Sequence, residues 1–96
     1  MATKIAFRMW DNEVVAVMPC DPATNAHDCT CYVHNGQHGA CDPHLAVSAS
    51  RPATEPEYRD LKRELEMIGY VVEVIHRINR SAYLEARRTE INRCRA

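Results

Sequence analysis

Residues 4–18 read KIAFRMWDNEVVAVM and predict two antiparallel strands joined by a tight turn. Apolar side chains recur at every second position of residues 5–9, which is the period of a half-buried strand. Asp11 and Asn12 both tolerate the left-handed backbone conformations of a two-residue hairpin turn. A mostly β-branched run follows and predicts the second strand, which we expect Pro19 to end.

A helix is predicted over residues 55–68. Thr54 can cap it, Glu57 three positions later completes a capping box, and Pro56 suits the first turn. Four apolar residues follow at helical spacing and form one stripe that can cover a sheet: Tyr58, Leu61, Leu65 and Ile68. Gly69 supplies the left-handed conformation that ends many helices.

Two further elements complete the expected fold. Residues 70–78 alternate and predict a return strand in the centre of the sheet, and residues 80–96 predict an arginine-rich C-terminal helix. Residues 20–50 are rich in Pro, Asp, Asn and His, so we expect an irregular loop with at most one short strand at 29–34. The expected class is α+β: a small antiparallel sheet, made of the hairpin and the return strand, packed by one amphipathic helix, with the C-terminal helix beside it. A chain of this length can hide one core, so residues 1–96 are expected to form a single domain.

The composition excludes several classes of protein. With 46% hydrophobic and 26% charged residues, the chain resembles ordinary globular domains. Its longest apolar run, Val14–Met18, has five side chains, whereas a membrane helix needs roughly 20 and a signal peptide roughly 7 to 15. Five cysteines without a secretion signal indicate reduced thiols rather than a disulfide framework. We therefore expect a cytoplasmic protein that is not bound to a membrane.

Four cysteines and four histidines lie within residues 20–44, a density typical of metal sites. Zinc is therefore one hypothesis, with ligands drawn from Cys29, His34, His38, Cys41 and His44. The spacing argues against it. Cys29 and Cys31 enclose one residue rather than the usual two to four, and we expect an extended backbone to direct the two side chains to opposite faces. The preferred prediction is no cofactor, with cysteines filling the core and histidines serving as polar loop residues.

Asn35 and Gly36 separate two of these histidines. A two-residue turn at this pair would place Val33 opposite His38, and His34 and His38 would then lie on opposite faces. A helical turn would instead bring the two histidines together. The hairpin is the favoured alternative, which argues further against a shared metal.

The sequence contains no established catalytic motif. A nucleophile elbow, a phosphate-binding glycine loop and a His-Glu-x-x-His helix are all absent. Cysteines and histidines between residues 29 and 41 supply the residue types of a nucleophile and its base, but residue types do not establish a geometry. We therefore expect a non-enzymatic protein.

Charge is distributed unevenly along the chain. Residues 1–75 carry a net charge of −5, whereas residues 76–96 carry +4 from six arginines and two glutamates. Such a tail can bind an acidic protein surface or a phosphate backbone. The predicted contact residues come from the loop and the tail: Tyr32, His34, Gln37, His38, Arg87, Arg88, Arg93 and Arg95.

A further indication comes from three segments: Ile5–Trp10, Tyr32–Ala40 and Arg51–Tyr58. Through them the chain resembles, over residues 4–78, a group of short hypothetical proteins carried on bacterial mobile elements. That group has no established activity and no fixed set of cysteines. The resemblance implies a bacterial, cytoplasmic accessory protein in which the region of His34, Gln37 and His38 is a shared feature.

Together these features predict a small non-enzymatic binding protein that acts through a protein partner, such as a host defence or regulatory complex. The alternative is a metal-stabilised nucleic-acid-binding module that uses the Cys/His-rich segment and the arginine-rich tail. A salt-dependent affinity for random DNA would favour the alternative.

Overall fold

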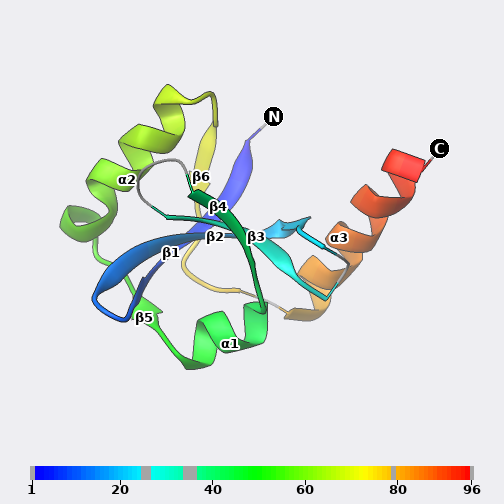
Figure 1. Cartoon of the computed structure of the whole chain (residues 1–96), viewed down its shortest axis with the longest axis horizontal. Helices are drawn as coiled ribbons and strands as arrows, with labels where there is room; N and C mark the ends of the chain where they lie inside the picture. Colours follow the sequence, from blue (N-terminus) through cyan, green and yellow to red (C-terminus); the bar gives the residue numbers. More distant parts are fainter. Residues whose placement is uncertain (1, 25–26, 34–36, 79, 96) are drawn as a thin grey trace.

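The computed structural model describes residues 2–24, 27–33, 37–78 and 80–95. In this part of the chain a six-stranded sheet combines with three helices in an α+β fold, which confirms the predicted class (Figure 1). The elements in chain order are β1 (Thr3–Trp10), β2 (Glu13–Pro22), β3 (Cys29–Val33), β4 (Gln37–Cys41), α1 (Pro43–Ser48), β5 (Arg51–Pro52), α2 (Glu55–Met67), β6 (Val72–Val74) and α3 (Arg80–Arg95). The strand order is β4-β3-β2-β1-β5, and β6 also pairs with β1.

The predicted hairpin is present in β1 and β2. Its last pair joins Trp10 and Glu13, and the two residues between them have φ angles of 51° at Asp11 and 62° at Asn12. Two successive left-handed residues suit the twist of a two-residue hairpin. Pro19 does not end β2, contrary to expectation. The strand continues to Pro22 because an irregularity after Met18 shifts the pairing with β3 and accommodates residues that cannot join a regular ladder.

The described residues of the segment 20–50 contain more regular secondary structure than the composition indicated. One short strand was expected, and β3 provides it, but β4 and α1 also lie within this segment. Asp42 begins α1, since its Oδ1 accepts a hydrogen bond from the His44 backbone N–H at 2.8 Å. The sequence signal for β4 was weak because Gly39, Ala40 and His38 have little strand preference of their own.

The return strand differs most from expectation. Instead of a long central strand over 70–78, β6 has three residues, lies at the edge and pairs parallel to β1. The apolar residues on both sides of the segment 70–78 do not reflect a central position in the sheet. Val72 and Val74 pack into the core beneath α2, whereas Ile75 and Ile78 pack into the core on the opposite face.

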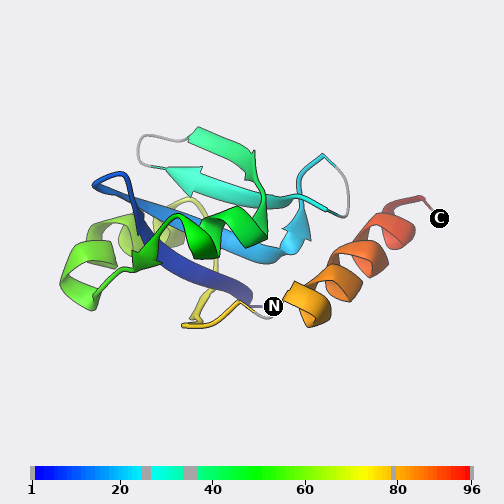
Figure 2. The same cartoon turned by 90° about the horizontal axis from the view of Figure 1, so that it is seen from below.

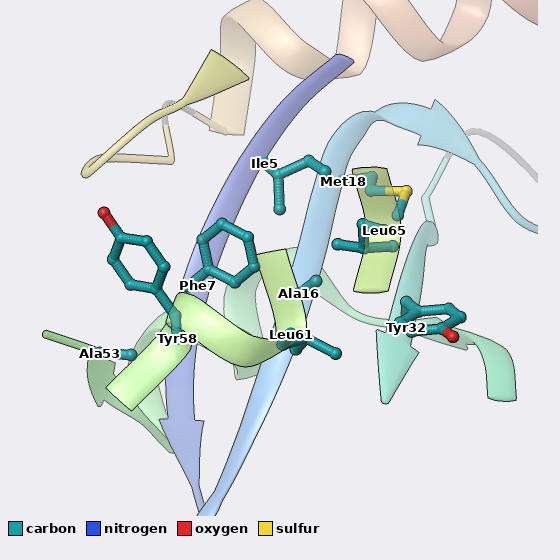
Figure 3. Close-up of a cluster of buried hydrophobic side chains, with 9 residues drawn as sticks. All are labelled: Ile5, Phe7, Ala16, Met18, Tyr32, Ala53, Tyr58, Leu61 and Leu65. Carbon is teal, nitrogen blue, oxygen red and sulfur yellow. The ribbon is translucent and has the colours of Figure 1, made fainter. Parts of the chain in front are cut away.

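Each face of the sheet has its own core. On one face Leu61 and Leu65 of α2 pack with residues of β1 and β2, and Phe7 stacks on Tyr58 with ring centroids 4.5 Å apart (Figure 3). On the other face Ala46 of α1 packs with Ala6 of β1, Val15 and Val17 of β2, and Cys29 of β3. Tyr58, Leu61 and Leu65 of the predicted stripe therefore cover the sheet as expected. Ile68 does not, because α2 ends at Met67 and the Ile68 side chain is 53% exposed.

The C-terminal helix α3 has the predicted position in the sequence. It packs against β2 and projects away from the end of the sheet (Figure 2). Arg87 is 2% exposed, and its Nη1 donates a hydrogen bond to the Pro19 carbonyl oxygen at 2.6 Å. The side chain thereby satisfies a carbonyl of the irregular end of β2 and ties α3 to the sheet.

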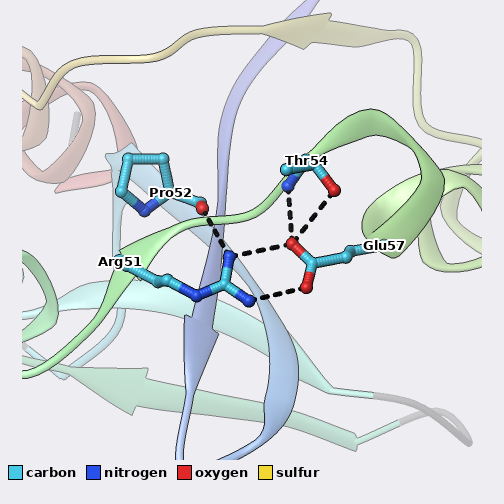
Figure 4. Close-up of polar contacts among 4 residues, drawn as sticks. All are labelled: Arg51, Pro52, Thr54 and Glu57. Atoms are coloured by element: carbon cyan, nitrogen blue, oxygen red, sulfur yellow. Dashed lines mark hydrogen bonds and ion pairs between the residues drawn. The ribbon is translucent and has the colours of Figure 1, made fainter.

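The start of α2 carries the predicted capping box and an added arginine (Figure 4). Glu57 Oε1 accepts a hydrogen bond from the Thr54 backbone N–H at 2.9 Å. Arg51 donates to both Glu57 carboxylate oxygens, from Nη1 at 2.9 Å and from Nη2 at 2.6 Å. Together, first the guanidinium and then the Thr54 N–H, these donors lower the pKa of Glu57 from 4.5 to about 2.

We expect this carboxylate to stabilise the fold above about pH 4.5 and to lose that effect as the pH falls through about 2, because its pKa is lower in the folded state. In urea unfolding, the parent protein should therefore have a higher free energy of unfolding than Glu57→Gln at about pH 6. This difference should disappear towards about pH 2. Glu55→Gln is the matched control, since Glu55 is an exposed acid of the same turn whose ion pair with Arg59 spans 3.5 Å. A gap that does not change with pH would contradict the role of the Glu57 charge.

Candidate edge-strand binding site

The two edges of the sheet differ in how well they are protected. One edge is formed by β5, with two residues including Pro52, and by β6, with three residues including the exposed Glu73. Short length, proline and charge all prevent further strands from pairing there. The other edge is β4, whose five residues QHGAC include no proline and no Lys, Arg, Asp or Glu. Residues 38–40 of β4 are exposed.

His38 connects this edge to the face covered by α2. It pairs in register with Tyr32 of β3, and its ring meets the Tyr32 ring edge-on with centroids 4.7 Å apart. Its Nε2 lies 3.0 Å from the Tyr70 hydroxyl oxygen, within hydrogen-bond distance. The Tyr32 hydroxyl in turn donates to a carboxylate oxygen of Glu64 on α2. We call these four residues the His38 cluster.

The His38 cluster is polar at its rim and buried at its base. Tyr32 is 1% exposed, whereas His38 is exposed and Tyr70 is half-buried. Burial, with a smaller contribution from Asp21, raises the pKa of Tyr70 above its usual 10, so the hydroxyl keeps its proton near neutral pH. The cluster can therefore donate and accept hydrogen bonds beside an open strand edge, which suits recognition of a polypeptide.

The turn between β3 and β4 differs from the predicted one. Val33 pairs with Gln37, not with His38, so three residues rather than two connect the strands. Those three, including His34, lie outside the described residues, and of Gln37 only the backbone in β4 is described. The shift by one residue turns His38 towards Tyr32 and away from the cysteines, because neighbouring strand positions face opposite sides.

Three thiols gather on the opposite face of the β3–β4 pair. The expectation that Cys29 and Cys31 face opposite sides is wrong, because residues two apart in a strand share a face. Cys41 pairs directly with Cys29, and their Sγ atoms are 3.4 Å apart. The hydrogen bond with Cys29 raises the pKa of Cys41 to about 12, and contact with Cys41 raises the pKa of Cys31.

Of the hypothetical zinc ligands, Cys29 and Cys41 are adjacent, whereas His38 and His44 do not join them and His34 lies outside the described residues. His38 and Cys41 lie on opposite faces of β4, and His44 is exposed in the first turn of α1. Among the residues that the structure describes, no group of three or more His, Cys, Asp or Glu side chains is arranged to hold a metal ion.

Three arginines of α3, Arg87, Arg88 and Arg93, bond to other residues of the protein. Arg87 is buried, as described above, so it does not offer its guanidinium to a partner. Arg88 pairs with Glu85 at 3.0 Å and Arg93 with Glu90 at 2.6 Å, each three residues apart on the same helix. For Arg95 only the helical backbone is described. These ion pairs reduce the positive potential of the tail that the sequence indicated.

Two members of the His38 cluster were not singled out from the sequence. Tyr70 lies within the predicted return strand 70–78, and the sequence gives Glu64 no role. No local signal links either residue to His38, since 32 positions separate His38 from Tyr70. Only the packing of α2 on the sheet brings them together.

Compared with models of protein families, with curated proteins and with solved structures, the chain has no match. None of the helices in the described ranges is both long and apolar enough to cross a membrane. The described residues form an α+β protein whose sheet has one protected edge, at β5 and β6, and one open edge, at β4.

Proposed function

We propose that this chain is a small non-enzymatic binding protein that pairs its edge strand β4 with an extended segment of a partner protein. The observation that carries the proposal is the difference between the two sheet edges. An edge strand with unpaired backbone groups is a template for another strand, and proteins that do not use such an edge usually block it. The edge formed by β5 and β6 is short and carries a proline and charged residues. The edge strand β4 carries neither a proline nor a charged residue.

Affinity and selectivity would come from different parts of the site. In strand addition, main-chain hydrogen bonds supply affinity, and pockets for alternate side chains supply selectivity. A five-residue strand offers few main-chain bonds, so the exposed ring of His38 and the hydroxyl of Tyr70 become important. The net charge of −5 on residues 1–75 favours a segment that carries basic residues.

The likeness to small proteins of mobile elements supports a partner in the bacterial cytoplasm, within a host defence or regulatory complex. The nucleic-acid alternative ranks second, because Arg88 and Arg93 are paired with glutamates of their own helix and Arg87 is buried. Salt-dependent binding to random DNA in the experiment below would favour this alternative.

The test compares three variants at exposed positions. Ala40→Lys adds a charge to the open edge, His38→Ala removes the ring beside it, and Ala49→Lys, at the end of α1, is the matched control. A host protein captured by the parent is purified, and its affinity is measured with each variant. We expect Ala40→Lys and His38→Ala to weaken binding by about tenfold or more, and Ala49→Lys to change it less than about twofold.

Two further measurements make the result decisive. Hydrogen exchange with the purified partner should protect the amides of residues 38–40, and His38→Ala should melt within about 3 °C of the parent. A much lower melting temperature of His38→Ala would show that the His38 ring stabilises the fold. Unchanged affinity of Ala40→Lys, protection confined to α3, or salt-dependent binding to random DNA would each contradict strand addition.

A further inference from the structure

The thiols on the α1 face of the sheet form a group that the proposed partner binding does not use. Cys29 is fully buried, whereas Cys31 and Cys41 are half-buried, and all three are free thiols in this structure. Cys29 and Cys41 occupy directly opposite positions of adjacent antiparallel strands, with their Sγ atoms 3.4 Å apart. A disulfide needs about 2 Å between the sulfurs and suits Cβ atoms of such close cross-strand neighbours. To form the bond, the two sulfurs would have to approach by about 1.4 Å.

We propose that Cys29 and Cys41 form a reversible cross-strand disulfide by exchange with a small disulfide such as glutathione disulfide. The Cys41 thiolate attacks one sulfur of the small disulfide, forms a mixed disulfide and releases one small thiol. Cys29 attacks the Cys41 sulfur, closes the Cys29–Cys41 bond and passes its proton to the departing small sulfur, which leaves as the second small thiol. The two protein sulfurs are oxidised, the small disulfide is reduced to two thiols, and the reaction reverses in excess thiol.

Exposure fixes which thiol reacts first. Cys41 is reached from solvent and Cys29 is not, so Cys41 takes the mixed disulfide and Cys29 resolves it. Cys31 also contacts Cys41, but in register it opposes Gly39 and lies diagonal to Cys41. Direct opposition therefore favours Cys29 over Cys31 as the partner.

The same contacts make the reaction slow near neutral pH. With its pKa raised to about 12 by the hydrogen bond with Cys29, Cys41 is almost entirely a protonated thiol at pH 7. The rate of exchange should therefore rise about tenfold for each pH unit between about pH 7 and 9. Slow exchange protects the reduced thiols during short exposure to a small disulfide. The final ratio of oxidised to reduced protein is set by the thiol and disulfide concentrations.

The inference does not depend on the proposed partner. A Cys29–Cys41 bond would link the edge strand β4 covalently to β3 and enclose the residues between the two cysteines in a covalent ring. The oxidised protein should consequently melt at least about 5 °C above the reduced one.

The experiment equilibrates the full chain in glutathione buffers of increasing oxidised fraction, quenches it in acid and blocks the remaining thiols. Cleavage after Tyr32 separates Cys29 and Cys31 from Cys41, so that a linked pair of fragments reports the bond. In Cys31→Ser we expect the linked pair at a glutathione ratio within about twofold of the parent. In Cys29→Ser and Cys41→Ser the linked pair should need at least about a tenfold more oxidising ratio or be absent. Melting of each variant in reductant checks that it is folded, and having both Cys29→Ser and Cys41→Ser keeps the test valid if one is not.

Three outcomes would overturn the proposal. These are a linked pair that persists in Cys29→Ser and disappears in Cys31→Ser, a glutathione adduct without a linked pair, and an exchange rate that does not depend on pH.

Discussion

Replacing Leu65 with alanine should lower the free energy of unfolding by about 2 to 5 kcal/mol. Leu65 is completely buried and belongs to the core that joins α2 to β1 and β2, beside Ile5 and Met18 (Figure 3). Alanine removes the apolar contacts of the side chain and leaves a cavity that the sheet beneath it cannot close. Leu61, 4% exposed on the same stripe, should show a loss in the same range.

Urea unfolding followed by circular dichroism measures this loss. Met67→Ala is the matched control, because Met67 lies two residues further along α2 and is 81% exposed. Its effect should stay within about 0.5 kcal/mol. If Leu61→Ala and Leu65→Ala were both as stable as the parent, α2 would not pack on the sheet as described.

Arg8→Met should cost about 2 to 3 kcal/mol, although it preserves much of the side-chain volume. Arg8 is 8% exposed, and its guanidinium donates to Ser50 Oγ and to the Ser50 carbonyl oxygen at 2.8 Å each, and to the Val47 carbonyl oxygen at 3.2 Å. Burial lowers its pKa, but an arginine remains charged near neutral pH. Methionine would leave two carbonyl groups near the end of α1 without these donors.

The control for Arg8 is Arg59→Met, whose guanidinium is exposed and lies 3.5 Å from Glu55. Exposed ion pairs contribute about 0 to 1 kcal/mol to stability. Arg8→Met should therefore be clearly less stable than Arg59→Met in urea unfolding. Hydrogen exchange should also become faster in α1 of the Arg8 variant and stay unchanged in α2. Equal stability of both variants would show that water replaces the Arg8 donors without loss.

Elements whose geometry is set within a few residues were predictable. Asp11 and Asn12 adopt positive φ angles because the turn demands them locally, and Gly69 does so at the end of α2. The bond from the Thr54 N–H to Glu57 spans three residues. For the site, the sequence pointed to Tyr32 and His38 but not to their arrangement.

What only the tertiary structure decided depends on contacts between distant residues. Strand alternation placed Arg8 opposite the predicted core face, but whether water or protein covers that face depends on α1, about 40 residues away. Cys29 and Cys41 meet because β3 and β4 pair in one register, and a shift of one residue would separate them. The open edge at β4 exists because β5 and β6 both pair with β1 at the other side of the sheet. The sequence by itself determined the hairpin, α2 and its cap, since local backbone preferences and apolar periodicity suffice for them. Which strand remained at the edge was decided by burial of both sheet faces at once, a property of the whole chain that no short segment contains.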